Sequence, residues 1–170
     1  MLRSHRVGYR VLGIAVLGGV LMLAAAPGRA QRADGGLFAG FAGNWSGGGT
    51  ITVSNGTSER IRCRAKYSVS DGGAGLQQDL RCASDSYKFE VTSNVINPGG
   101  SAIQGSWTEI TRNASGNVSG NATGGRIDAS VEGVGFSAGL SLTTSGNSQS
   151  VTIRPHGTDV TLVSISMRRG

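Results

Sequence analysis

A strict alternation of apolar and polar residues constrains the fold of this chain more than any other feature, and it is clearest in residues 60–69. Successive side chains of a β-strand point to opposite faces, so a strand with this pattern buries one face and exposes the other to water. The apolar positions are Ile61, Cys63, Ala65, Tyr67 and Val69. The polar positions are Arg60, Arg62, Arg64, Lys66 and Ser68.

The same period of two recurs along the rest of the chain, whereas the i, i+3, i+4 spacing of an amphipathic helix is absent from residues 43–168. We predict further strands at 45–53, 76–83, 87–95, 102–110, 127–133, 136–142, 151–154 and 160–167. Between the strands lie the turn signals Asn55-Gly56, Gly72-Gly73, Asn97-Pro98-Gly99-Gly100, Gly124-Gly125, Gly146-Asn147 and His156-Gly157. The sequence therefore predicts an all-β fold, an antiparallel meander of nine or ten strands.

Such a meander has to protect its edge strands from pairing with other chains. A closed barrel removes the edges completely, and a two-layer sandwich removes them only in part, so we favour a closed up-and-down barrel over a sandwich. Four glycines inside the predicted strands are expected to act as bending points or as places of close backbone approach. These are Gly105, Gly120, Gly133 and Gly139.

The two cysteines, Cys63 and Cys82, lie symmetrically about Gly72-Gly73, so a hairpin that turns there places them on facing strands. An even number of cysteines in an exported chain indicates a disulfide, and two buried free thiols are the alternative. A two-residue loop would put the pair on a hydrogen-bonded rung, with Cα atoms about 5.5 Å apart. A loop longer by one residue would put them on a diagonal, and the sequence leaves this open.

Residues 1–30 are predicted to be a cleavable signal peptide. Arg3, Arg6 and Arg10 precede an uncharged apolar run of about 15 residues, shorter than the roughly 20 that span a bilayer as a helix. We therefore expect an exported, periplasmic or extracellular protein without a transmembrane span after cleavage. A flexible segment over 31–42 and a single β domain over 43–168 are expected to follow.

The positive charge of the whole chain overstates the charge of the mature protein. Removal of residues 1–30 takes away four of the sixteen basic residues and none of the ten acids, so the net charge falls from +6 to +2. We therefore expect no nucleic-acid partner, because most of the excess basic charge that attracts nucleic acid leaves with residues 1–30. The row Arg60 to Lys66 remains, either as a solvated strand face or as a binding stripe.

Residues 113–124 repeat the pattern N-x-[ST]-G three times. In an extended chain this places every Asn, Ser and Thr on one face and only Ala, Val and Gly on the other. We expect a solvated edge strand or a flexible loop, with a recognition surface as the alternative.

No catalytic, cofactor-binding or metal-binding constellation is visible in the mature sequence. His156 is its one histidine and lies in a Pro-His-Gly turn. No G-x-S-x-G nucleophile elbow leads from a strand into a helix, because the sequence indicates no helix. The acids are dispersed along the chain, so an enzyme would need carboxylates that meet across strands, as in a glycoside hydrolase. We expect a protein that is not an enzyme and needs no cofactor or metal.

The first predicted strand begins with Gly43-Asn44-Trp45, which resembles the G-x-W of lipocalin-like and avidin-like up-and-down barrels. The resemblance covers three residues in motif and the mature chain in architecture, and it implies a tryptophan that closes one end of a barrel. This chain ends on a strand where lipocalins usually have a helix. Its G-x-W start, the R-C-R-x-x-Y of residues 62–67 and the D-L-R-C of residues 79–82 also look like small exported bacterial proteins of uncharacterised function.

Three functions remain open for the mature protein. The first is a binding or envelope-associated module that takes a small apolar ligand or an envelope component. The second is a structural or interaction protein that uses its outer sheet face, and the third is a hydrolase with cross-strand carboxylates. The candidate interior or ligand-facing aromatic residues are Trp45, Tyr67, Tyr87, Phe89, Trp107 and Phe136.

Overall fold

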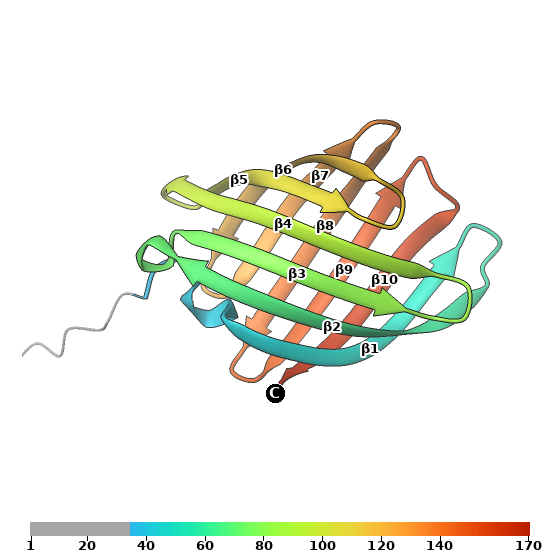
Figure 1. Cartoon of the computed structure of the whole chain (residues 1–170), viewed down its shortest axis with the longest axis horizontal. Coiled ribbons are helices and arrows are strands. Elements are labelled where there is room, and N and C mark those ends of the chain that lie inside the picture. The colour runs from blue at the N-terminus through green and yellow to red at the C-terminus, as the bar shows by residue number, and fades with distance from the viewer. Residues whose placement is uncertain (1–34) are drawn as a thin grey trace, which may run out of the picture. The chain divides into compact units, whose positions relative to one another are not determined.

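The computed structural model describes residues 35–170 and forms a closed antiparallel barrel of ten strands. Each strand pairs with its neighbours in sequence, and β1 pairs with β10 to close the sheet (Figure 1). The predicted all-β meander and the preference for a closed barrel are confirmed. The strands are β1 (Gly43–Val53), β2 (Ser58–Ser70), β3 (Gly75–Ala83), β4 (Lys88–Gly99), β5 (Ala102–Glu109), β6 (Ala114–Thr123), β7 (Arg126–Gly133), β8 (Phe136–Ser145), β9 (Ser148–His156) and β10 (Val160–Arg169).

The alternation in the sequence sets the two faces of the sheet. On β2, the inward residues Ile61, Cys63, Ala65 and Tyr67 are only 2 to 4% exposed, whereas the arginines and the lysine between them are exposed. Burying an aliphatic or aromatic side chain of this size contributes roughly 1.5–3 kcal/mol, so the inward rows of the strands supply the driving force for closure.

The strands tilt, and this tilt decides which residues meet. A row of directly paired inward residues begins at Tyr67 on β2, near the end of the barrel where β1 starts, and finishes at Phe136 on β8, at the opposite end. A closed sheet requires such a stagger because its strands are inclined to the barrel axis. The intermediate members of the row are Gln78, Ser93, Trp107, Gly116 and Gly133.

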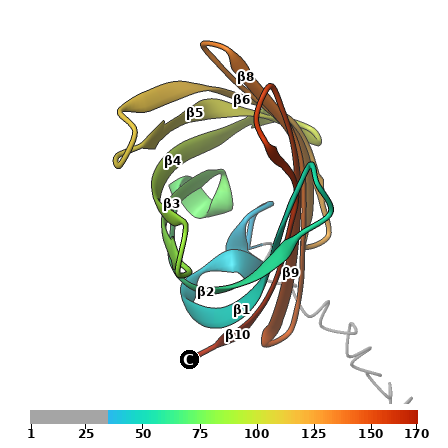
Figure 2. The same ribbon diagram turned by 90° about the vertical axis from the view of Figure 1, so that its right-hand side faces the viewer.

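The segment before β1 lies against the end of the barrel where β1 starts. It contains the 3-10 turn η1 (Ala39–Phe41), and both Phe38 and Phe41 have no exposed surface. The backbone N–H of Phe38 donates to Gly73 O at 3.0 Å, in the second 3-10 turn η2 (Asp71–Gly73). Figure 2 views the barrel from its other end, with η1 and η2 behind.

The predicted signal peptide, residues 1–30, lies outside the described residues. Within the segment 31–42, for which the sequence indicates flexibility, the described residues 35–42 contribute Phe38 and Phe41 to the core. The alternation predicts no core residue before Gly43, because two aromatic residues in a run without alternation produce no strand signal.

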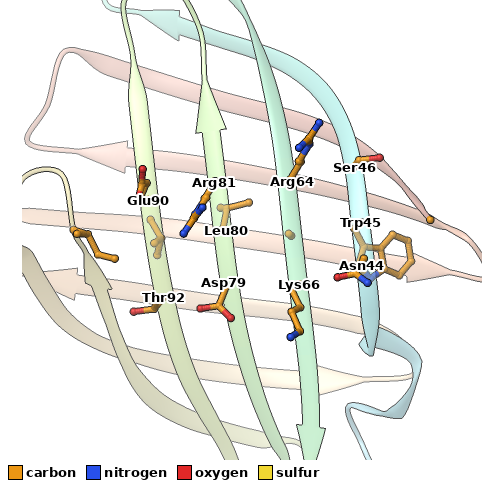
Figure 3. Close-up of a pocket in the computed structure, with 14 residues that line it drawn as sticks. Asn44, Trp45, Ser46, Arg64, Lys66, Asp79, Leu80, Arg81, Glu90 and Thr92 are labelled. Atoms are coloured by element: carbon orange, nitrogen blue, oxygen red, sulfur yellow. The ribbon is translucent and has the colours of Figure 1, made fainter.

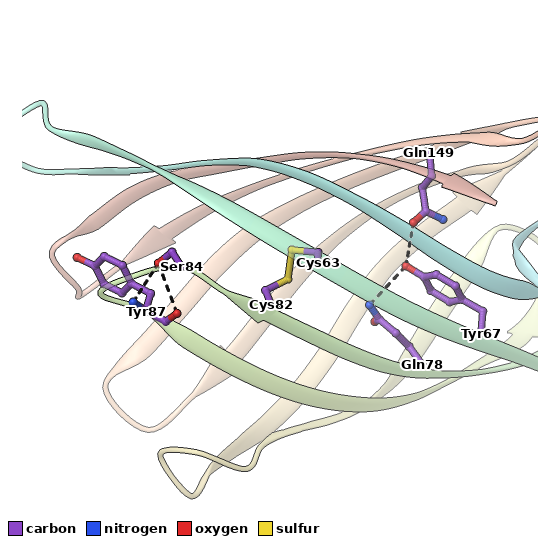
Figure 4. The surroundings of a disulfide bond; sticks show 7 residues. All are labelled: Cys63, Tyr67, Gln78, Cys82, Ser84, Tyr87 and Gln149. Carbon is purple, nitrogen blue, oxygen red and sulfur yellow. Dashed lines mark hydrogen bonds between the residues drawn. A yellow bond between two sulfur atoms is a disulfide. The ribbon is translucent and has the colours of Figure 1, made fainter. Parts of the chain in front are cut away.

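Cys63 and Cys82 form a disulfide between directly paired positions of β2 and β3 (Figure 4). Their Cα atoms are 4.1 Å apart, which is near the distance of a non-hydrogen-bonded pair and not the 5.5 Å of a hydrogen-bonded rung. The hairpin loop has four residues, 71–74, and it is still centred on Gly72-Gly73. Compared with a two-residue loop, it moves the cysteine pair from a hydrogen-bonded to a non-hydrogen-bonded position.

The N-x-[ST]-G repeat forms β6, which pairs with β5 on one side and β7 on the other. The expectation of an edge strand or a loop is therefore wrong, because closure of the barrel leaves no edge. The expected division of faces holds: Asn, Ser and Thr point outward and are exposed. The inward residues are Ala114, Gly116, Val118, Gly120 and Ala122.

Glycines allow close approach of the backbones of adjacent strands. A Cβ atom on Gly105 would collide with Asn94 O, and one on Gly120 would collide with Asp128 O. A Cβ on Gly133 would lie 2.9 Å from the Trp107 ring. Gly139 differs, since a Cβ there would meet nothing within 4 Å, and it marks no close approach.

Candidate functional site

Trp45 closes the end of the barrel where β1 starts. It is 2% exposed, and its Nε1–H donates to Phe41 O at 2.9 Å. The Arg169 guanidinium lies over the indole ring, 4.5 Å from the ring centroid, and donates to Gly40 O at 2.7 Å and to Ala42 O. The position of Trp45 agrees with what the G-x-W resemblance implied. No pattern in the sequence pointed to Arg169, which holds η1 against the indole ring.

A chain of hydrogen bonds crosses the buried interior beside this closed end (Figure 4). The Tyr67 hydroxyl donates to Gln149 Oε1 at 3.2 Å and accepts from Gln78 Nε2 at 3.4 Å. Ser93 Oγ donates to Gln78 Oε1 at 3.1 Å, and Gln149 Nε2 donates to Thr144 Oγ1 at 3.0 Å. Burial raises the pKa of Tyr67, so its phenol remains protonated and donates.

Tyr67 was expected inside the barrel from the alternation of β2, but the polar residues around it were missed. Gln149 is only 2% exposed, and it points inward from β9, as Val151 and Ile153 do. Extending the alternation of β9 two residues toward the N-terminus would have placed Gln149 inside. Buried polar side chains need such partners, because an unpaired buried group costs about 1–3 kcal/mol.

Aromatic residues gather at the opposite end of the barrel. Trp107 and Phe136 make an edge-to-face contact with ring centroids 5.7 Å apart, and Trp107 Nε1–H donates to Glu132 O at 3.1 Å. The ring centroids of Tyr87 and Phe89 lie 6.2 Å apart. Four of the six predicted aromatic residues therefore lie at this end, while Trp45 and Tyr67 lie at the closed end.

Glu109 orders the loop between β5 and β6 at the same end. Its Oε1 accepts from Glu90 N at 3.0 Å and from Thr111 N at 3.1 Å, and its Oε2 accepts from Arg112 N at 2.7 Å. Burial alone would raise the pKa of Glu109, but these bonds and the Thr111 hydroxyl together lower it below the usual value. The ordered Arg112 then lies over the Phe89 ring, 4.9 Å from its centroid.

The interior beside β5 and β6 is lined by small residues. The inward positions of β6 carry only alanine, glycine and one valine, and Gly105 faces Val118 from β5. An eight-stranded barrel is just wide enough for side chains to fill or for one small ligand to enter, and the diameter grows with the number of strands. Side chains of this size fill less of the interior than larger apolar side chains would. Val118 is only partly buried.

Two hollows lie on the outer face of the barrel. The first crosses β1 to β4, has a volume of about 560 Å³ and is lined by charged side chains that include Arg64, Lys66 and Arg81 (Figure 3). The second crosses β6 to β9, has a volume of about 570 Å³ and is lined mainly by small and polar residues, with Asp128 and Arg154 among them.

Titratable groups with lowered pKa values are paired locally. Asp128 accepts two hydrogen bonds from the exposed Arg126, at 2.5 and 2.9 Å, and these bonds lower the pKa of its carboxyl. Lys88 lies 2.9 Å from Glu90 and lowers the pKa of that carboxyl. Glu90 shares the first outer hollow with Asp79, on the neighbouring strand.

Within residues 35–170, no group of three or more His, Cys, Asp and Glu residues is arranged to hold a metal ion. His156 is exposed at the end of β9. In the same part of the chain, no helix is long and apolar enough to cross a membrane.

No family model and no curated protein sequence matches the chain. The barrel is similar to Rv2717c from M. tuberculosis, with a TM-score of 0.58, 12% identity, and coverage of 77% of this chain and 93% of that one. It is also similar to the S-type phycobiliprotein lyase CPES from Guillardia theta, with a TM-score of 0.57, 10% identity, and coverage of 78% and 90%.

A de novo designed fluorescence-activating β-barrel matches with a TM-score of 0.46, 12% identity, and coverage of 78% of this chain and 96% of the design. At these identities the similarity to the first two structures concerns the fold alone. That fold is the up-and-down β-barrel, as the resemblance of the first strand implied.

Proposed function

We propose that this protein is a non-enzymatic binding module that holds a small, mainly apolar ligand inside the barrel, beside β5 to β8. The observation that carries the proposal is the lining of β6, whose inward residues are all alanine, glycine or valine in a ten-stranded barrel. From their small size we infer a space for the ligand. Ligand sites in barrels lie in their mouths and are mostly apolar with a few placed polar groups. Trp107 and Phe136 supply apolar area at the end opposite Trp45.

The hydrogen-bonded chain on the closed side gives the ligand a polar end. Ser93 pairs directly with Trp107 across β4 and β5, so the chain reaches from Tyr67 to the aromatic residues. Thr144 accepts from Gln149, and its own hydroxyl proton is free to bond a ligand oxygen. A ligand with an apolar body and one uncharged hydrogen-bonding group suits this interior, because the polar groups there carry no net charge.

Export is a further part of the proposal. The disulfide between Cys63 and Cys82 is stable in an oxidising compartment, which supports a periplasmic or extracellular location. The phycobiliprotein lyase shares the barrel with this chain, and the proposal for an apolar ligand rests on this chain's own interior.

The test uses a pair of substitutions on adjacent residues of β6 that point to opposite faces. Val118→Phe fills the space inside the barrel, and Ser119→Phe adds the same ring to the outer face. The apolar fluorophore N-phenyl-1-naphthylamine is titrated into each protein, and its fluorescence gain gives the affinity. We expect Val118→Phe to weaken binding at least tenfold and Ser119→Phe to change it less than twofold.

Native mass spectrometry of the protein purified from its own compartment supplies a second readout, as the mass of a retained small molecule. Equal melting temperatures of the two variants, within a few degrees, show that both fold. The proposal fails if the unsubstituted protein does not bind the fluorophore, or if the inward and outward phenylalanine variants bind it equally.

A further inference from the structure

The outer face of β2 and β3 concentrates positive charge, and its one acid on these two strands is Asp79, directly opposite Lys66. It carries five of the eleven basic residues of the described chain: Arg60, Arg62, Arg64, Lys66 and Arg81. No carboxylate between residues 35 and 170 forms an ion pair with any of the five. On the β1 side their direct partners are the uncharged residues Thr50, Gly48, Ser46 and Asn44.

Two of these arginines face each other. Arg64 on β2 pairs directly with Arg81 on β3, and Figure 3 shows the two side chains in one cross-strand row with Glu90. Like charges at directly opposite positions destabilise a sheet. Glu90 is directly opposite Arg81 and attracts it, but its ion pair is with Lys88. An anion between the two guanidinium groups would relieve the repulsion between them.

Cations outnumber carboxylates in the hollow at this place. It has a volume of about 560 Å³, and Arg64, Lys66 and Arg81 lie along it together with Asp79 and Glu90 (Figure 3). Arginine forms paired, charge-assisted hydrogen bonds with sulfate, phosphate and carboxylate groups. The uncharged Asn44 and Ser46 on its β1 side offer hydrogen bonds to hydroxyl groups.

The cations are spaced as a row, and this favours a polymer over a single ion. From Arg60 to Lys66 the charges occupy every second residue of one strand, so they span about 20 Å in steps of about 6.7 Å. Within residues 43–99 the outward positions carry no aromatic side chain on which a base could stack, which disfavours single-stranded nucleic acid. The outward residues of β1 beside the row are polar, so no apolar group there would enter a bilayer.

We propose that the outer face of β2 and β3 binds a linear acidic polysaccharide, with its anionic groups on the arginine row and its hydroxyl groups on the polar residues of β1. This site lies on the opposite side of the sheet from the interior ligand site. A protein with both sites would attach its barrel to an anionic glycan while the interior stays free for a ligand.

The test compares two exposed, outward arginines that have no ion pair within residues 35–170. Arg64→Gln removes a member of the facing pair, and Arg154→Gln on β9 changes the net charge by the same amount elsewhere. Heparin fragments of defined length serve as the acidic polysaccharide, and affinity is measured at several salt concentrations. We expect Arg64→Gln to weaken binding at least fivefold and to lower the salt slope by about one, and Arg154→Gln to change affinity less than twofold.

The same variants are melted without ligand at low ionic strength. Because Arg64→Gln removes a like-charge contact, we expect its melting temperature to rise by about 1–3 °C, an increase that disappears at 1 M salt. If Arg64 had a merely structural role, its replacement by glutamine would instead lower the melting temperature. The interior variant Val118→Phe is expected to bind heparin like the unsubstituted protein, which separates this proposal from the proposed function.

Several results would overturn the inference. Equal weakening by Arg64→Gln and Arg154→Gln would mean attraction to net charge without a site. If inorganic sulfate displaces heparin when its concentration only equals that of the sulfate groups on the heparin, the site binds a single ion and not a polymer. Tighter binding to vesicles of anionic phospholipid, or to an oligothymidylate, would assign the face to a membrane or to nucleic acid.

Discussion

At the scale of single residues, the polar side chains that count are those whose partners come from distant parts of the sequence. Arg169 donates to two carbonyl groups that precede β1, and Tyr67 bonds to Gln149 on a strand 82 residues further along the chain. Glu109 is the clearest case, because one buried carboxylate accepts from two backbone N–H groups of the loop between β5 and β6 and from one of β4. The negative charge of Glu109 strengthens these three hydrogen bonds in the folded protein.

Glu109 therefore makes stability depend on pH. Its pKa is lower in the folded protein than its usual value near 4.5, so its contribution is complete at neutral pH and is lost as the pH falls through the folded pKa. We expect Glu109→Gln to lower the free energy of unfolding at pH 7 by about 1–3 kcal/mol and to flatten its decline on acidification, as measured by urea denaturation from pH 7 to pH 3.

Glu132→Gln is the matched control, since Glu132 is exposed on β7. It should leave the stability at pH 7 unchanged within about 0.5 kcal/mol. Identical pH profiles for Glu109→Gln and the unsubstituted protein would rule out this role for Glu109.

At the scale of elements, β6 shows how a strand can be built almost without apolar side chains. Its inward positions alternate glycine with alanine or valine, and its outward positions carry asparagine, serine and threonine. Such a strand would be weak in isolation, because glycine adds conformational entropy to the unfolded chain. Pairing on both sides holds it, and the glycines let the neighbouring backbones come close.

Gly116 and Gly139 should therefore respond in opposite ways to the same change. A Cβ at Gly116 would collide with Glu132 O on β7, whereas a Cβ at Gly139 would meet nothing within 4 Å. We expect Gly116→Ala to destabilise the barrel by about 1–3 kcal/mol. We expect Gly139→Ala to be neutral or to stabilise by up to about 1 kcal/mol. Thermal melts followed by circular dichroism measure both, and equal losses would contradict the role assigned to Gly116.

At the scale of the whole molecule, the two ends of the barrel differ in packing. Phe38, Phe41 and Trp45 fill the end where β1 starts and are at most 2% exposed. At the other end, Phe136 is only partly buried and packs on Trp107, outside the main hydrophobic cluster. The aromatic residues of the first end are therefore the more completely buried, and the other end is the side from which we propose that a ligand enters.

Truncation of one aromatic residue at each end separates these roles. Phe41→Ala should cost about 3–5 kcal/mol of unfolding free energy and leave the affinity for N-phenyl-1-naphthylamine within twofold. Phe136→Ala should cost about 1–2 kcal/mol and weaken the binding of the fluorophore at least fivefold. Chemical denaturation and fluorophore titration of the same two samples provide the measurements. A larger stability loss from Phe136→Ala than from Phe41→Ala would refute this division of the barrel.

Local patterns in the sequence were sufficient for the faces, the disulfide and every strand of the barrel except β6. Alternation is a property of adjacent residues, so the buried set on β2 follows from residues 60–69 alone. The symmetry of Cys63 and Cys82 about one turn likewise uses a single hairpin. The resemblance of Gly43-Asn44-Trp45 to the first strand of known barrels added the closed end.

The tertiary structure decided every feature that depends on the stagger of a closed sheet. Strand tilt separates Tyr67 and Phe136, members of one cross-strand row, by the length of the barrel. Closure turned β6 from an expected edge into an interior strand of the sheet, and it brought Arg169 to Trp45. The local sequence determines which way each side chain points, whereas the inclination of ten strands to a common axis determines which side chains meet.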